Sequence, residues 1–106
     1  MSQADPPVPA VPTRSELVAR VRELLEQDSG NMRMDHPHVR ERLSSRRLSL
    51  RQVLDTIENG DAIDGPVLDE WGDWRIKFKW SSGGRRVQVV VAVPARQRHF
   101  TVVTVI

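Results

Sequence analysis

The residue types best suited to chemistry in this chain are a histidine and two arginines at intervals of four, His38, Arg42 and Arg46. If the segment is helical, these side chains lie on one face of the helix. An imidazole can move a proton near neutral pH, and guanidinium groups can bind a phosphodiester and stabilise its transition-state charge. Together they would suit cleavage of RNA through attack by its own 2′-hydroxyl group. The alternative is a solvent-exposed histidine beside ordinary surface arginines.

A second set of cations alternates with apolar residues. Arg75, Lys77 and Lys79 occupy every second position, which is the pattern of a half-buried strand with its cations on one side. Further basic residues flank the turns on either side of the next apolar segment: Arg85, Arg86, Arg96, Arg98 and His99. This pattern predicts a stripe that binds a nucleic-acid backbone, unless it is a solvated face or an edge strand that lysine guards against aggregation. Trp71 or Trp74 could stack on bases, although tryptophan in so small a chain more often serves the core or an interface.

The acidic residues gather just before this second set. Residues 52–73 carry seven carboxylates and no base, whereas residues 74–106 carry seven bases and no acid. The carboxylates that could hold a hard metal ion are Asp61, Asp64, Asp69, Glu70 and Asp73. Their spacing matches no metal-binding loop, and the three histidines have no telling carboxylate partners, so we expect no metal and no cofactor. We expect instead a solvated acidic loop, which could also oppose the basic strands within the fold.

Composition limits the remaining classes of function. Fourteen of the sixteen basic residues are arginine, whose planar fork of donors suits phosphate, although solvated strand and helix faces would have the same composition. There is no cysteine, which excludes disulfides, zinc-thiolate sites and a cysteine nucleophile. No apolar run approaches the about 20 residues of a membrane span, and residues 1–7 lack the basic and apolar regions of a secretory signal. We therefore expect a cytoplasmic protein without a membrane partner.

Capping signals and apolar periodicity predict the helices that position these residues. Thr13 and Ser49 each begin a capping-box spacing. The first box predicts a helix over about 14–27 that Gly30 stops, and the second predicts a helix that ends at Gly60.

The helix that would carry His38 has weaker signals. Asp35 is expected to cap it, and Pro37 would lie in its first turn, where a missing N–H does no harm. Val39 and Leu43 mark its buried side. The helix is expected to end near Arg47.

Four segments with a period of two follow and predict strands. They cover about residues 62–68, 75–80, 87–93 and 100–106. Two glycines near residue 83 favour a hairpin turn between the second and third segments. In the last segment every second residue is expected on one side of the strand: Phe100, Val102, Thr104 and Ile106. Val90, Val103 and Val105 are in the opposite register. We therefore expect the central strands to be covered on both faces.

The predicted fold is one α+β domain over residues 13–106, preceded by a disordered tail at 1–12. Two to three N-terminal helices are followed by a three- or four-stranded antiparallel meander, with the helices packed on one face. Residues 32–34 are expected to add a short edge strand, and a partner protein or a second copy could pair with that edge.

The ordered series of motifs resembles a small bacterial family known only as domain of unknown function 4258. His38, Arg42 and Arg46 are similar to the opening His–Arg–Arg motif of that family, although Arg46 falls one residue later than in its shortest form and Arg47 stands where glycine is usual. Residues 53–60 look like its helix and closing glycine. The final apolar run, with its Thr104, is similar to its last strand, so that the resemblance covers residues 36–106.

This family looks like the RelE/ParE-type toxin superfamily. The resemblance implies helices followed by an antiparallel sheet, and a toxin that a cognate antitoxin neutralises and that acts as an RNA endonuclease. His38, Arg42, Arg46 and Thr104 match motif positions, while Lys77 joins the predicted catalytic set on our own inference, because the chain has no tyrosine. The other readings are a non-catalytic nucleic-acid- or protein-binding module, and an inhibitor that presents its acidic segment to a protein partner as a phosphate mimic.

Overall fold

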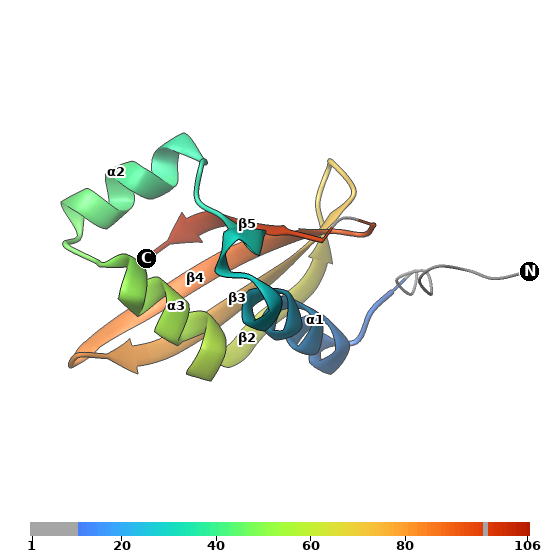
Figure 1. Cartoon of the computed structure of the whole chain (residues 1–106), viewed down its shortest axis with the longest axis horizontal. Helices are drawn as coiled ribbons and strands as arrows, with labels where there is room; N and C mark the ends of the chain where they lie inside the picture. Colours follow the sequence, from blue (N-terminus) through green and yellow to red (C-terminus); the bar gives the residue numbers. More distant parts are fainter. Residues whose placement is uncertain (1–10, 97) are drawn as a thin grey trace, which may run out of the picture.

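A computed structural model of the chain describes residues 11–96 and 98–106 (Figure 1). Its helices are α1 (Arg14–Gln27), the short 3₁₀ helix η1 (Ser29–Asn31), α2 (Pro37–Ser45) and α3 (Leu50–Asn59). Its strands are β1 (Met32–Arg33), β2 (Asp61–Leu68), β3 (Asp73–Ser82), β4 (Arg85–Pro94) and β5 (Phe100–Val105). The predicted tail at 1–12 lies outside the described residues except for its last two.

The strands form one mixed sheet in the order β1-β5-β4-β3-β2. Strands β2 to β5 make the predicted antiparallel meander, but β1 adds to β5 in parallel and pairs Met32 with Phe100. The sheet therefore has five strands rather than three or four. The short strand predicted at 32–34 is confirmed as an edge, and its parallel direction makes the sheet mixed.

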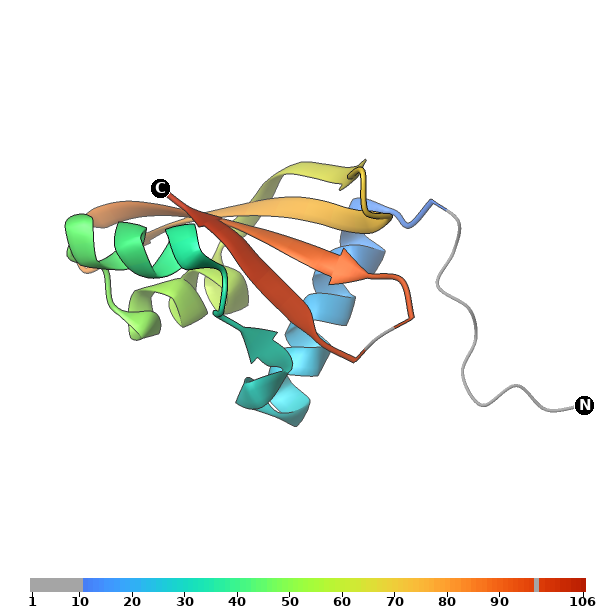
Figure 2. The same ribbon diagram turned by 90° about the horizontal axis from the view of Figure 1, so that it is seen from above.

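The helices α1 and α3 cover one face of the sheet, and α2 packs beside β5 (Figures 1 and 2). The core between these layers takes residues from α1, α3 and alternate positions of β3 and β4, and its completely enclosed members include Val21, Leu24, Val53, Ile57, Phe78, Val89 and Val91. The helix packing on one face agrees with the prediction. Among the described residues no helix lies over the opposite face, so the expectation that both faces are covered is wrong.

A bulge near the end of β5 explains part of that error. The register pairs Val90 with Thr104 and Val91 with Val102, which leaves Val103 as an extra residue. Beyond the bulge the facing of the side chains reverses, because successive residues of a strand point to opposite faces. Val105, not Thr104, therefore enters the core.

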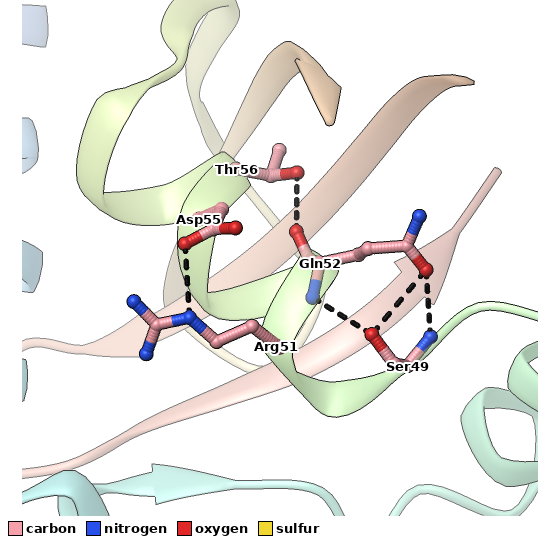
Figure 3. Close-up of polar contacts among 5 residues, drawn as sticks. All are labelled: Ser49, Arg51, Gln52, Asp55 and Thr56. Atoms are coloured by element: carbon pink, nitrogen blue, oxygen red, sulfur yellow. Dashed lines mark hydrogen bonds and ion pairs between the residues drawn. The ribbon is translucent and has the colours of Figure 1, made fainter. Parts of the chain in front are cut away.

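Both predicted capping boxes form. Figure 3 shows the box of α3, in which the Ser49 hydroxyl accepts a hydrogen bond from the Gln52 N–H at 3.2 Å and the Ser49 N–H donates to the Gln52 side chain at 2.9 Å. Glu16 makes the equivalent bond to the Thr13 N–H at 2.9 Å, and this bond and the Thr13 hydroxyl lower the pKa of its carboxyl. These local bonds fix where α1 and α3 begin.

Other helix boundaries differ from the prediction. Gly30 does not stop α1, because the chain turns at Asp28, whose side chain accepts the Gly30 N–H at 2.8 Å within η1. His36, not Asp35, occupies the N-cap of α2, and it makes no side-chain capping bond. The helix ends at Ser45, two residues before the predicted end.

Gly60 joins α3 to β2 for a steric reason. Its backbone is extended and has no left-handed conformation, but a Cβ atom there would collide with the carbonyl oxygens of Thr56 and Lys79. The close approach lets the chain pass directly from α3 into β2. The strand predicted over about 62–68 is confirmed as β2, so the acidic residues of this segment lie on a strand and the solvated loop expected for them is wrong here.

Two arginines of α1 bind the backbone of this junction. Arg22 donates to the carbonyls of Ile57 at 3.0 Å and Gly60 at 2.7 Å. Arg14 donates to the carbonyls of Gly65 at 2.8 Å and Ala62 at 3.3 Å on β2. The helix thus satisfies acceptors on the edge strand as well as packing on the core.

No helix in the described part of the chain is long and apolar enough to cross a membrane.

Candidate nucleic-acid interface

The stripe predicted on β3 forms on the sheet face that no described helix covers. Ile76 and Phe78 of β3 are buried under the helices, so Arg75, Lys77 and Lys79 point to the other side. Alternate residues of a strand lie about 6.6–6.8 Å apart along its axis. The three cations therefore form a row across the middle of the uncovered face.

The neighbouring strands give this row one acidic side and one uncharged side. Asp61 and Asp64 of β2 pair with Lys79 and Lys77. On the other side, β4 places uncharged residues beside the same cations, and these are Gln88, Val90 and Ala92. An anionic chain would therefore meet less repulsion over β3 and β4 than over β2.

Arg75 is held in place by an ion pair. Its Nε lies 3.1 Å from the Asp69 carboxylate, a side chain that is only 9% exposed. Burial would raise the pKa of Asp69, but hydrogen bonds from the Asp73 N–H, from Arg75 and from the Trp71 N–H together lower it. The carboxylate therefore stays ionised near neutral pH and neutralises part of the Arg75 charge.

Asp73 begins β3 on the uncovered side, because the next residue, Trp74, packs against the core, and His99, just before β5, comes close enough to interact with its charge. Burial lowers the pKa of His99, and Arg33 lowers it further, against the opposing effects of Asp73 and Asp35. Burial, together with the charge of Asp69, raises the pKa of Asp73. A neutral imidazole can accept a proton near neutral pH.

The histidine–arginine group on α2 lies elsewhere. His38 and Arg42 are exposed on α2, and Arg46 is its exposed C-cap residue. Buried Val39 and half-buried Leu43 attach this helix to the core beside β5.

Strand β4 separates β5 from β3, so the helix group and Lys77 lie on different parts of the molecule. Strands in a sheet are about 4.7–4.9 Å apart, which places the axis of β3 roughly 10 Å from that of β5, the strand that α2 contacts. Of the four residues predicted as catalytic, His38, Arg42 and Arg46 thus come from α2 and its C-cap, whereas Lys77 comes from β3.

The rings of His36 and His38 lie near each other at the start of α2. Their centroids are 5.4 Å apart, and the Nδ1 atom of His36 is buried without a hydrogen-bond partner. No group of three or more histidine, aspartate or glutamate side chains in the described part of the chain could hold a metal ion.

The other predicted binding residues are divided between the two sides of the sheet. Arg85 donates to the Arg47 carbonyl at 3.1 Å, so it ties the β3–β4 hairpin to the loop between α2 and α3. Arg86 pairs with Ser81 and precedes buried Val87, so it is directed to the uncovered face. Arg96 and Arg98 are exposed in the turn between β4 and β5.

Sequence reasoning missed two contributors to this surface. Arg33 lies beside Thr101 because β1 runs parallel to β5, and Asp73 comes close enough to His99 to affect its pKa. The predicted edge strand at 32–34 was the signal that could have drawn attention to Arg33. No local signal joined Asp73 to His99, since they belong to different strand ends.

Comparison with known proteins assigns a family to most of the chain. No curated protein and no solved structure matches the chain. The match to a protein family extends over residues 36–106, from the N-cap of α2 through β5, and so contains α2, the row of cations and His99. The chain thus belongs to the family described as Domain of unknown function (DUF4258).

Proposed function

We propose that this protein binds RNA through the uncovered face of its sheet. The observation that carries the proposal is the row of Arg75, Lys77 and Lys79 on β3, opposite the helices. Cations at regular intervals on a rigid strand can neutralise successive phosphates of one chain. The uncharged residues of β4 beside them leave room for that chain, whereas the acids of β2 limit it on the other side.

A binding experiment tests this role. Fluorescence anisotropy with a labelled single-stranded RNA would be measured from low to high salt for the wild type, Lys77→Ala and Arg51→Ala. We expect Lys77→Ala to weaken binding several-fold and to reduce the salt slope by about 0.7, the value for one phosphate contact on a single strand. Arg51→Ala is the matched control, because it removes a cation from α3 on the opposite layer. Equal affinities for all three proteins, or binding that does not change with salt, would contradict the proposal.

A second candidate is an endoribonuclease toxin of the RelE/ParE-like type, which a cognate antitoxin would neutralise in the cytoplasm. Two observations favour it. The motif of His38 and Arg42 is exposed on α2, and the helices that cover one side of a largely antiparallel sheet agree with the fold that the resemblance implies. A neutral His99 close to Asp73 offers an alternative proton-transfer group on the same face as the cations.

Induced expression in a bacterial host tests the second candidate. Growth and total RNA would be followed for the wild type, the double variant His38→Ala/Arg42→Ala, and His99→Gln. Growth arrest with RNA fragmentation that only the double variant abolishes assigns the chemistry to α2, and loss in His99→Gln alone assigns it to the sheet. Normal growth and intact RNA with well-folded wild-type protein would contradict the second candidate. The first candidate, RNA binding without cleavage, would then stand.

A further inference from the structure

The three tryptophans have different environments. Trp71, in the turn between β2 and β3, is 71% exposed. Trp74 is half-buried against the core, and Trp80 lies on the helix side of β3, since it pairs with buried Val87. An indole that contributes little to the core and is largely open to solvent needs an explanation of its own, because burial of such a ring normally stabilises a small domain.

The turn that carries Trp71 is ordered by hydrogen bonds. The buried carboxylate of Asp69 accepts the N–H groups of Trp71 and Asp73, each at 2.9 Å. The Asp69 N–H donates to the Asp73 carbonyl at 2.9 Å, and the Gly72 N–H donates to the Asp69 carbonyl at 3.2 Å. Gly72 has the positive φ of 82° that the tight turn requires. The indole is thus held out by a fixed scaffold.

The exposed indole adjoins the row of cations. The Arg75 guanidinium lies 5.9 Å from the centroid of the Trp71 ring, and the same guanidinium is bound to Asp69. Arg75 is the cation of the β3 row nearest to the turn. One aromatic ring therefore stands at the end of a row of three positive charges.

We propose that Trp71 stacks on an unpaired base of single-stranded RNA whose backbone follows Arg75, Lys77 and Lys79. This inference rests on the proposed function and specifies its ligand. An aromatic ring accepts a base only if that base is free of its own helical stack, so a continuous duplex would not use Trp71. Stacking on a ring beside a row of cations is a common arrangement for binding single strands without sequence preference.

A protein ligand is the competing occupant of this surface. Val67 and Leu68 next to the turn are 54% and 55% exposed, and with Trp71 they make an apolar patch. The charge beside the ring favours RNA, because Arg75, Lys77 and Lys79 continue from it across the open face. A wild type that binds none of the RNA probes below would favour the protein ligand.

The test measures binding to three probes by fluorescence anisotropy. They are an oligoadenylate of about 12 nucleotides, within the site sizes known for single-strand binders, an abasic oligomer of the same length, and a duplex of the same length. We expect Trp71→Ala to weaken oligoadenylate binding about ten-fold and to leave the abasic oligomer unchanged. Trp71→Phe should restore most of the loss, and Leu68→Ala is the matched control for an exposed apolar side chain. Thermal unfolding would establish that each variant is folded.

The outcomes distinguish the inference from the proposed function. If Trp71→Ala binds oligoadenylate as the wild type does while Lys77→Ala binds weakly, the stacking role is overturned and RNA binding stands. Wild-type binding to the duplex as tight as to the single strand would also overturn it. If the wild type binds none of the three probes, the proposed function itself fails.

Discussion

At the scale of single residues, environment rather than identity separates the three histidines. His38 is exposed, and His36 has a buried, unpartnered Nδ1 atom, while His99 has its pKa lowered by burial and by Arg33. Only the last of these stands on the face that carries the β3 cations. A histidine that is neutral at physiological pH can accept a proton there, which an imidazolium cannot.

The lowered pKa of His99 predicts a pH dependence of stability. In the unfolded chain His99 takes up a proton at its ordinary pKa of 6.5, whereas in the folded protein it is protonated only at a lower pH. The unfolded state therefore binds more protons in that window, and the free energy of unfolding falls as the pH drops below 6.5. We expect His99→Gln to flatten this part of the curve in urea unfolding measured between about pH 7 and pH 5. An unchanged slope in the variant would show that His99 does not cause it.

Asp73 contributes with the opposite sign. Its pKa is raised, first by burial and then by the charge of Asp69, so its contribution to stability is lost as the pH rises above the ordinary value of 3.8 through the folded value. We expect Asp73→Asn to weaken the fall in stability that accompanies rising pH in this acidic range. Urea unfolding at a series of acidic pH values measures the effect, and Glu70→Gln, an exposed change in the same turn, is the control.

At the scale of elements, local hydrogen bonds set the boundaries that sequence could predict. The capping boxes of α1 and α3 involve residues three apart, so their chemistry is visible in the sequence. The start of α2 was predicted less well because its N-cap makes no side-chain bond that would mark it. The bulge at Val103 had no sequence signal, since it depends on how β5 aligns with β4.

The α3 cap and the neighbouring ion pair should differ in energetic weight. Ser49→Ala removes the hydroxyl that accepts the Gln52 N–H, and we expect it to lower the free energy of unfolding by about 1 kcal/mol. Arg51→Ala breaks the ion pair with Asp55, in which the Arg51 side chain is 72% exposed, and should cost less than about 0.5 kcal/mol. Figure 3 shows both interactions. Chemical unfolding of the two variants compares the two losses in the free energy of unfolding directly. Equal losses would contradict this assignment.

The turn between β2 and β3 should depend on one carboxylate. Asp69→Ala removes the acceptor of two backbone N–H groups and the partner of Arg75. We expect the free energy of unfolding to fall by about 1–3 kcal/mol, because one of the two donors left without this acceptor, the Asp73 N–H, is partly buried. Glu70→Ala, in the same turn but exposed, should change stability little. If both variants unfold alike, the turn is held by its backbone bonds alone.

At the scale of the whole molecule, the residues before the family match belong to the same core. Leu17, Val21 and Leu24 of α1 are buried with residues of the sheet, and Arg22 binds carbonyls at the α3–β2 junction. The sequence predicted the α+β class and the order of helices before strands from periodicity. It did not predict the five-stranded order, because the pairing of β1 with β5 joins segments that are far apart in the chain.

A chain that begins at His36 should therefore fail to fold alone. Removing α1 exposes the apolar face of the sheet, and losing several large buried side chains costs more than the about 5–15 kcal/mol by which domains are stable. We expect no cooperative thermal transition for this shortened protein, and recovery of the transition when a peptide of residues 11–35 is added. A cooperative transition without the peptide would show that the matched region is an independent domain.

The position of β5 between β1 and β4 also governs when the sheet can be completed. The hairpins β2–β3 and β3–β4 join neighbouring segments and can form as soon as each pair has left the ribosome. Strand β1 is synthesised much earlier, but its partner is β5. Met32 therefore cannot form its native pairing until Phe100 has been synthesised. The first and last strands of the sheet thus pair in a single late event. The β1–β5 ladder is therefore the part of the sheet that is absent from the nascent protein for the longest time.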